Sequence, residues 1–257
     1  MSALPKDFAT ESGHWYDREG NPRYTIIGKN GKERNTTVRD ARIHSLVPSV
    51  TTVNRGAAAP GLERYKVRQA IMSALTLARQ EGESDESYIA RIVRDSEEQA
   101  KKARDKGTEI HGAIEKMYRE GFLNAEHPHF EPAMQAQRAV EKWAGWEPVW
   151  NAERSFASPL GYGGKLDLSA PGYVCDFKTT DKPLADLKTW PDHRRQLAAY
   201  RMGLDMPSAR CAICYVSSVN PEARLIELPE EELQQGWAEF KALLALWYSS
   251  NKMEMPK

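Results

Sequence analysis

Two aspartates and a lysine interrupt a stretch of strand-forming residues in the 257-residue chain. Asp167 lies near the end of one apolar segment, and Asp176 and Lys178 lie in the next, with a Pro-Gly pair at 171–172 between the segments. Because Pro-Gly is a turn signal, the two segments are predicted to form a hairpin. Carboxylates that meet across a hairpin are hard oxygen ligands of the kind Mg²⁺ prefers, and a neighbouring amine can act on water or phosphate.

The length of the loop decides how the two aspartates meet. If residues 171–172 alone form the loop, Asp167 lies directly opposite Asp176, and with a four-residue loop it lies diagonally opposite. The Cβ atoms are then about 5 to 7 Å apart, a distance at which like charges oppose the pairing. Lys178 follows Asp176 at the two-residue period of a strand and shares its face. This face is either a metal site with a lysine or the solvated outer face of a hairpin.

The same triplet of an acid, any residue and lysine also occurs at 186–188 and 239–241. The triplet alone is therefore weak evidence for a site. The triplet at 176–178 differs because it lies in an apolar strand and has an acidic partner, Asp167, across a turn.

Further candidate residues lie on the elements that must position this hairpin. Steps of three and four along a long predicted helix align Thr108, His111 and Glu115 beside an apolar seam. A neutral imidazole at His111 could add a nitrogen ligand and favour Mn²⁺ relative to Mg²⁺, whereas a helix-surface histidine is the simpler interpretation. Glu153, in a strand predicted over 150–156, is either an acid beside the site or a solvated residue.

A later helix has a polar face in the segment DHRRQLAAYR, residues 192–201. His193, Gln196 and Tyr200 align at helical steps, and arginines such as Arg195 surround them. Such a face can hold phosphates by charge-assisted hydrogen bonds, or it can be an ordinary wet surface.

The hydrophobic pattern favours one α/β domain over residues 1–257. Residues 1–55 are expected to form an N-terminal β element, 60–145 a helical region that carries His111, and 146–257 the catalytic sheet with its flanking helices. The apolar seam of the long helix comprises Ala100, Ala103, Gly107, Ile110, Ile114 and Met117. The remaining elements are expected to be strands between 150 and 179, a helix over 192–204, a strand over 212–217 and a last helix.

Composition argues against several classes of protein. Lys plus Arg and Asp plus Glu number 36 each, so the formal net charge is zero and a polyanion must be held by local basic clusters. Three cysteines are too few for a disulfide framework, and Cys211 and Cys214 lack a second CxxC to complete a zinc site. No apolar run approaches the roughly 20 residues of a membrane helix, and residues 1–15 lack a secretion pattern, so we expect a cytoplasmic protein.

Taken in order, these residues resemble the PD-(D/E)xK nuclease superfamily, and specifically its RecB-like branch with phage and recombination exonucleases. The resemblance spans roughly residues 107–200. Its motifs are Gly107-Thr108-x-x-His111-x-x-x-Glu115, Glu153 opening a strand, Gly164-x-x-Asp167 followed by Asp176-Phe177-Lys178-Thr179, and Gln196-x-x-x-Tyr200. The resemblance implies a restriction-endonuclease-like core, in which helices flank a central mixed sheet, with an N-terminal hairpin and a helical cap.

The resemblance also assigns roles to these positions. It implies that the divalent metal, Mg²⁺ or Mn²⁺, is bound by His111, Asp167, Asp176 and the backbone carbonyl of Phe177. It implies that Lys178 is the catalytic amine, and Glu153 is expected among the catalytic acids. The residues expected to contact or support DNA are Thr179, Arg195, Gln196 and Tyr200, with Thr108 and Glu115 in the layer around the site. No iron–sulfur cluster is expected, because three cysteines in strands cannot replace the four that some members of the branch use.

The activity that the resemblance implies is that of a metal-dependent DNA exonuclease acting on single-stranded or duplex ends in phage or bacterial recombination or repair. A recombination or annealing protein is a possible partner, and the expected location is the cytoplasm of a bacterium or of a phage-infected cell. Three alternatives stay open. They are a structure-specific endonuclease on the same core, a catalytically silent DNA-binding module, and a zinc hydrolase built on the histidines.

Overall fold

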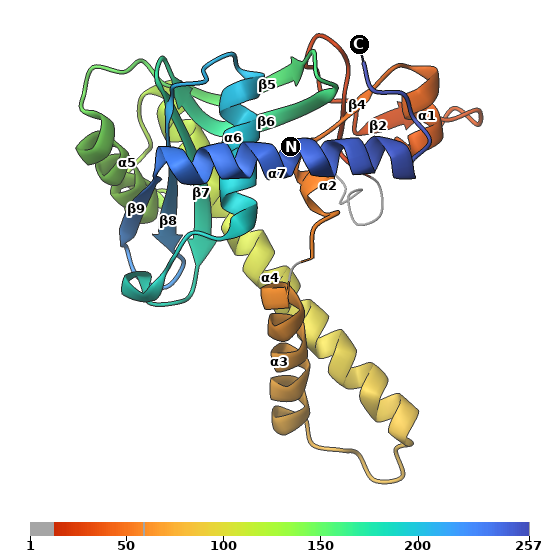
Figure 1. Cartoon of the computed structure of the whole chain (residues 1–257). Coiled ribbons are helices and arrows are strands. Elements are labelled where there is room, and N and C mark those ends of the chain that lie inside the picture. The colour runs from red at the N-terminus through yellow and green to blue at the C-terminus, as the bar shows by residue number, and fades with distance from the viewer. Residues whose placement is uncertain (1–12, 59, 257) are drawn as a thin grey trace.

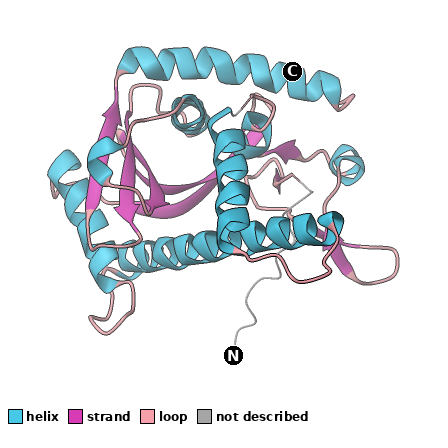
Figure 2. Cartoon of the chain, turned by 90° about the horizontal axis from the view of Figure 1, so that it is seen from below, coloured by secondary structure: helices cyan, strands magenta, loops and turns pink. Residues whose placement is uncertain are grey.

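The chain folds around a mixed β-sheet with helices on both faces (Figures 1 and 2). The computed structural model describes residues 13–58 and 60–256, so most of the segment 1–15, which lacks a secretion pattern, lies outside the described residues. Within the described residues the main sheet has five strands, in the spatial order β5 (Asn151–Ser158), β6 (Tyr162–Ala170), β7 (Tyr173–Thr180), β8 (Arg210–Ser217) and β9 (Ala223–Leu228). β7 and β8 are parallel and the other neighbours are antiparallel. The expected central mixed sheet flanked by helices is confirmed.

One face of the sheet packs against α2 (Val50–Asn54), α6 (Pro191–Gly203) and α7 (Glu230–Ser250). α6 connects β7 with β8, as parallel neighbours require a crossover instead of a tight turn. The buried side chains on this face include Leu166, Val174, Leu197, Ile213 and Phe240. α7 is the expected last helix, and its Leu233, Phe240 and Leu244 are buried.

The opposite face is covered by α4 (Asp85–Glu120) and α5 (Phe130–Ala144). α4 is one helix of 36 residues, which begins after the N-cap Ser84 and ends at Gly121, whose φ of 77° is left-handed. Its predicted seam is buried from Gly107 onward through Ile110, Ile114 and Met117. Ala103, earlier in the same seam, is exposed, because that part of the helix has left the body of the protein.

Gly107 marks the position at which α4 meets β7. A Cβ atom added to Gly107 would lie 2.6 Å from Thr179 Oγ1, much closer than such atoms approach each other. Glycine therefore permits the helix to lie directly on the end of the strand that carries Asp176 and Lys178. The Gly107-Thr108 motif thus has a packing explanation.

α3 (Pro60–Thr76) and the first part of α4 project from the body as a helical hairpin, which we call the arm, residues 60–106 (Figure 1). The two helices are joined through polar contacts, among them the hydrogen bonds that the Tyr88 hydroxyl donates to the carbonyls of Ala74 and Leu77. Several apolar side chains of the arm are exposed, namely Val67, Ile71, Leu75, Ile89 and Val93. The expected helical region therefore includes a projecting part.

The N-terminal element consists of β1 (Trp15–Tyr16), β2 (Thr25–Ile27), β3 (Glu33–Asn35), α1 (Val38–Ile43) and β4 (Val47–Pro48). β2 and β3 form an antiparallel hairpin. This element is anchored on β6, where a Cβ atom at Gly163 would be 2.8 Å from the ring of Tyr16. It therefore borders the sheet close to the Gly164-x-x-Asp167 motif.

Two expectations from composition can be compared with the structure. Cys175, Cys211 and Cys214 are buried and form no disulfide. Among the helices of residues 13–58 and 60–256, none has the length and apolarity needed to cross a bilayer.

Candidate active site

The ladder between β6 and β7 ends just before the two aspartates. Its pairs are Leu168 with Cys175, Ser169 with Val174 and Ala170 with Tyr173. This is the register of a two-residue loop, so the next pair along would be Asp167 with Asp176, and no ladder pair forms there. Instead, Asp167 Oδ2 accepts a hydrogen bond from the backbone N–H of Phe177 at 2.7 Å. A carboxylate thus takes the place of a strand carbonyl, and the two strands part at this point.

The ladder between β5 and β6 is interrupted at the same residue. The pairs on either side of the interruption are Ala152 with Leu168 and Arg154 with Leu166. Between them Glu153 faces Asp167 and has a φ of 55°, a conformation that is strained for a residue with a side chain. Leu166 lies in the core under α6 and Leu168 in the core under α4, although residues two apart in a regular strand share a face. Asp167 therefore lies at an irregularity in β6, and the side chains two residues apart on either side of it point to opposite faces of the sheet.

Asp176 is buried and held by side chains from β7 and α6. Gln196 Nε2 donates to Asp176 Oδ1 at 2.9 Å, and Lys178 Nζ lies 2.6 Å from Asp176 Oδ2. Lys178 Nζ also donates to Gln196 Oε1 at 3.3 Å, and Gln196 Nε2 donates to the Tyr200 hydroxyl at 2.9 Å. Among the described residues Asp176 Oδ2 accepts no hydrogen bond of good geometry, so the ammonium of Lys178 is the contact that balances this oxygen.

The two carboxylates affect protonation throughout the site. Burial raises the pKa of Asp167 well above its ordinary value, and the charge of Asp176 raises it further, against the opposing effects of Lys178 and the Phe177 N–H. Burial disfavours the ammonium of Lys178, but the charges of Asp176 and Asp167 outweigh burial and raise the pKa of Lys178. The lysine is therefore charged in this arrangement, and an added cation would relieve the repulsion between the carboxylates.

His111 approaches the site from α4, one turn after Gly107. Its Nδ1 is 3.7 Å from Asp167 Oδ2, and its ring packs edge-on against Phe177 with 6.4 Å between the centroids. Burial lowers the pKa of His111, although the charge of Asp176 opposes this effect. The neutral imidazole, which is the form that binds metals, is therefore favoured.

The donors decide whether a divalent ion fits. Among the described residues, no three His, Cys, Asp or Glu side chains form a cluster that could hold a metal by itself. Mg²⁺ is often bound by only one or two carboxylates plus water, and Asp167 and Asp176 supply two. Since the N–H and C=O of one strand residue point to the same side, the Phe177 carbonyl faces the opened ladder beside Asp167. This donor set fits Mg²⁺ or Mn²⁺ better than zinc, which usually takes four nitrogen or sulfur ligands.

Sequence reasoning missed Lys165, which lies two residues before Asp167 on β6. Lys165 forms an ion pair with Glu153 across the β5–β6 ladder. Burial, the largest effect, lowers the pKa of Lys165, but Glu153 and then Glu115 outweigh it, and the pKa is raised. A lysine in a strand is usually solvated, so the sequence offered no signal that singled out Lys165.

The predicted residues of α6 are closer to the core than expected. Arg195 is 9% exposed, and its Nη1 lies 3.2 Å from Glu239 Oε2. The guanidinium is thus enclosed and paired in this structure, and the DNA contact of Arg195 stays a prediction. Gln196 and Tyr200 are also buried and act on the site through Asp176 instead of facing solvent.

The predicted residues of the surrounding layer have different environments. Thr108 is exposed, and its hydroxyl donates to the Arg104 carbonyl at 3.1 Å. Glu115 accepts from Arg119 Nη1 at 2.7 Å and lies within electrostatic reach of Lys165. Thr179 packs against Gly107, as described above.

Comparisons with known proteins place the chain in no family. No family model and no curated protein matches the sequence. Among solved structures, a proposed exonuclease from Eubacterium rectale is similar with a TM-score of 0.41 and 13% identity, over 59% of this chain and 70% of that chain. The protein SSO0001 is similar with a TM-score of 0.26 and 13% identity, over 71% of this chain and 85% of that chain. Likenesses at this level carry no weight for function, which must be inferred from the site itself.

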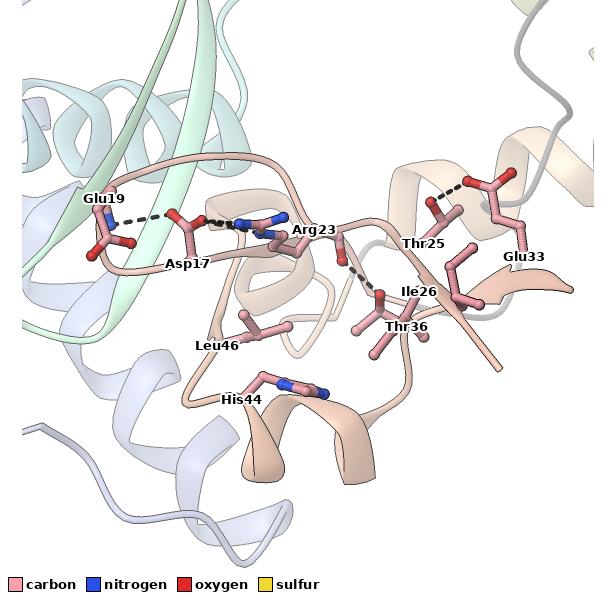
Figure 3. Close-up of a pocket in the computed structure, with 10 residues that line it drawn as sticks. Asp17, Glu19, Arg23, Thr25, Ile26, Glu33, Thr36, His44 and Leu46 are labelled. Carbon is pink, nitrogen blue, oxygen red and sulfur yellow. Dashed lines mark hydrogen bonds and ion pairs between the residues drawn. The ribbon is translucent and has the colours of Figure 1, made fainter. Parts of the chain in front are cut away.

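A separate pocket of about 620 Å³ lies in the N-terminal element (Figure 3). Figure 3 shows that charges in its wall pair with one another, for example Asp17 with Arg23, while Glu33 accepts a hydrogen bond from Thr25. None of the predicted site residues lines this pocket. The pocket is therefore distinct from the candidate active site, which lies where the β6–β7 ladder ends.

Proposed function

We propose that this chain is a divalent-metal-dependent deoxyribonuclease that hydrolyses phosphodiester bonds from the ends of DNA. The observation that carries the proposal is the pair of Asp176 and Lys178, held together where Asp167 opens the β6–β7 ladder. Asp176 is 3% exposed, so the alternative of a solvated outer face does not describe it. Desolvating ion pairs costs several kcal/mol and contributes little to stability, so such a cluster is better explained by chemistry.

Asp167, Asp176 and the carbonyl of Phe177 would hold Mg²⁺ or Mn²⁺, with His111 at the border of the site. Asp167 Oδ2 accepts the Phe177 N–H, and a carboxylate has further lone pairs with which it could bind an ion. When bound, the ion would polarise a phosphate oxygen and lower the pKa of a water molecule.

The position and charge of Lys178 define its role. In hydrolysis the water oxygen forms a bond to phosphorus, the bond from phosphorus to a bridging oxygen breaks, and the proton that the attacking water loses passes through solvent to the leaving oxygen. An ammonium has three donors and no acceptor, so it cannot take that proton. Because Asp176 and Asp167 favour the charged amine, we assign Lys178 to orienting the water and to stabilising negative charge on the phosphate.

Gln196 and Tyr200 are positioning residues in this proposal. The amide of Gln196 donates to Asp176 and accepts from Lys178, so one side chain fixes the distance between them. The Tyr200 hydroxyl accepts the other amide hydrogen bond and thereby fixes the orientation of the amide.

The preference for DNA ends rests on the resemblance of the motifs to those of RecB-like exonucleases. The same resemblance supports the proposals that the enzyme acts in phage or bacterial recombination or repair and that it works beside a recombination or annealing protein.

The test is digestion of end-labelled linear DNA, single-stranded and duplex, beside a closed circle, in Mg²⁺, Mn²⁺ or chelator. We expect metal-dependent release of nucleotides from linear DNA, lost in Lys178→Ala. Lys188→Ala is a matched control, because the exposed Lys188 has the same spacing from Asp186 at the end of η1 (Leu184–Asp186). Cutting of the circle would favour the endonuclease. DNA binding without cleavage would favour the silent module. Activity that only zinc restores would favour the zinc hydrolase.

A further inference from the structure

We propose that Lys165 binds a DNA phosphate next to the one that is cleaved, and that Glu153 is the partner it leaves when DNA arrives. This inference rests on the proposed nuclease function. Lys165 lies two residues before Asp167, and its side chain is 39% exposed while that of Glu153 is 23% exposed. The ammonium is therefore at the rim of the site, in contact with water and yet held in place.

Asp167 is flanked by two acid–lysine pairs. On β7 the pair is Asp176 with Lys178, and across the β5–β6 ladder it is Glu153 with Lys165. In the first pair the carboxylate of Asp176 is buried and both side chains are hydrogen-bonded to Gln196, so the pair is fixed. The second is half-exposed, so its lysine is free to exchange one anion for another.

Charges and rings from other elements also face Lys165. Glu115 of α4 and Tyr24 of the N-terminal element lie within its electrostatic reach. Glu115 already has Arg119 at 2.7 Å, which leaves Glu153 as the carboxylate paired with Lys165. The ammonium thus stands where strands, helix and N-terminal element meet.

Stability alone does not explain this pair. An ion pair that is partly in water contributes little to stability. The left-handed φ of 55° at Glu153 is strained for a residue with a side chain. Backbone strain beside a weak ion pair is the pattern found where a side chain is held for function.

The exchange would replace one anion by another at the same cation. Lysine contacts to phosphates position a nucleic acid without reading its sequence. On binding, the ammonium moves from the Glu153 carboxylate to a non-bridging phosphate oxygen, and no covalent bond changes. Glu153 then competes with DNA for Lys165, so the two residues are expected to have opposite effects on DNA binding.

The experiment measures binding of a fluorescent single-stranded DNA by anisotropy over a range of salt, in chelator so that no cleavage occurs. Lys165→Met is expected to weaken binding several-fold and to reduce the slope of log affinity against log salt by about 1. Glu153→Gln is expected to tighten binding, and Lys165→Arg to keep it. Lys142→Met, at an exposed lysine on α5, is the control for general loss of charge.

Unchanged affinity and salt slope in Lys165→Met would overturn the inference, as would weaker binding in Glu153→Gln with its thermal stability intact. With metal present, Lys165→Met is expected to raise KM and leave kcat near the wild-type value. If the wild type cleaves DNA through Lys178 and Lys165→Met changes neither quantity, this inference alone fails. If the wild type cleaves no DNA in any metal, the proposed function fails, whatever Lys165 does to binding.

Discussion

The carboxylate of Asp167 accepts the backbone N–H of Phe177 at 2.7 Å, so a side chain completes a hydrogen bond that a neighbouring strand would otherwise complete. This contact does two things at once. It satisfies a donor on β7 after the ladder with β6 has ended, and it fixes Asp167 beside Asp176 despite their like charges. The opening in the sheet and the orientation of the carboxylate therefore have one origin.

Asp167→Asn should change how the stability of the protein depends on pH. The pKa of Asp167 is raised by burial and by Asp176, so this carboxyl contributes stability that is fully present below about pH 4 and lost as pH rises through its folded pKa. The amide keeps an oxygen for the Phe177 N–H but does not ionise. Thermal unfolding in chelator should show the stability of the variant rising relative to that of wild type as pH rises above about 4. The prediction is contradicted if the Tm of the variant and that of wild type change with pH in the same way.

Divalent metal should restore to the wild type the stability that it loses as pH rises. An ion that binds only the folded protein stabilises it, and the gain grows with concentration. We expect Mg²⁺ or Mn²⁺ to raise the Tm of wild type near pH 8 and to raise that of Asp167→Asn much less. Equal shifts in both proteins would place the metal elsewhere.

Gly107→Ala should destabilise the protein by about 1 to 3 kcal/mol, because its Cβ would lie 2.6 Å from Thr179 Oγ1. Gly112→Ala is the matched control on the same helix, since a Cβ there meets nothing within 4 Å. That variant should be more stable than wild type by about 0.5 to 1 kcal/mol. Urea unfolding measures both, and adding Thr179→Ala to Gly107→Ala should restore most of the loss. Failure of that rescue would show that the contact with Thr179 is not the cause.

Glu153→Gly should be more stable than Glu153→Ala by about 1 kcal/mol, because only glycine adopts the positive φ without strain. Both variants lose the ion pair with Lys165, so the comparison isolates the backbone. Denaturant midpoints of the two variants, measured side by side, give the difference. Equal midpoints would mean that the strand relaxes around residue 153.

Asp40→Asn should destabilise the N-terminal element by about 2 kcal/mol near pH 7, through loss of a charged, two-bond contact. Arg34 donates to both oxygens of Asp40, at 2.6 and 2.8 Å. The Arg34 guanidinium holds the pKa of Asp40 well below its ordinary value, so this stability is present above about pH 4 and lost as pH falls. The penalty of the substitution should therefore shrink toward about pH 3. A penalty independent of pH would assign it to packing instead.

The parts of the fold that were predictable depend on local pattern. The hairpin of β6 and β7 follows from a Pro-Gly turn between two apolar runs, and α7 follows from apolar residues at helical steps. β9 (Ala223–Leu228) was missed because its alternating residues are few and lie between two prolines, which suggest a loop. The buried seam of α4 was predicted to begin too early, because the same apolar spacing continues on the N-terminal side of Gly107, where the helix no longer contacts the body.

The parts of the site that could not be predicted depend on contacts between distant residues. The sequence of α6 indicates a wet face, but α7 covers Arg195 and supplies Glu239 to it. α7 can approach this closely because a Cβ at Gly236 would lie 2.5 Å from the Arg194 carbonyl. The left-handed conformation of Glu153 and its pair with Lys165 likewise arise from the meeting of β5 with β6 and have no signature in either segment alone.

The continuous α4 gives the molecule a mechanical property. At 1.5 Å per residue, the tip of the arm at Asp85 is about 33 Å from Gly107, and His111 is about 6 Å beyond it on the other side. If the helix tilts about its tight contact with Thr179, the two distances act as the arms of a lever with a ratio of about five to one. A displacement of about 5 Å at the tip then moves the imidazole by about 1 Å relative to Asp167, which is the scale on which ligand geometry is made or lost.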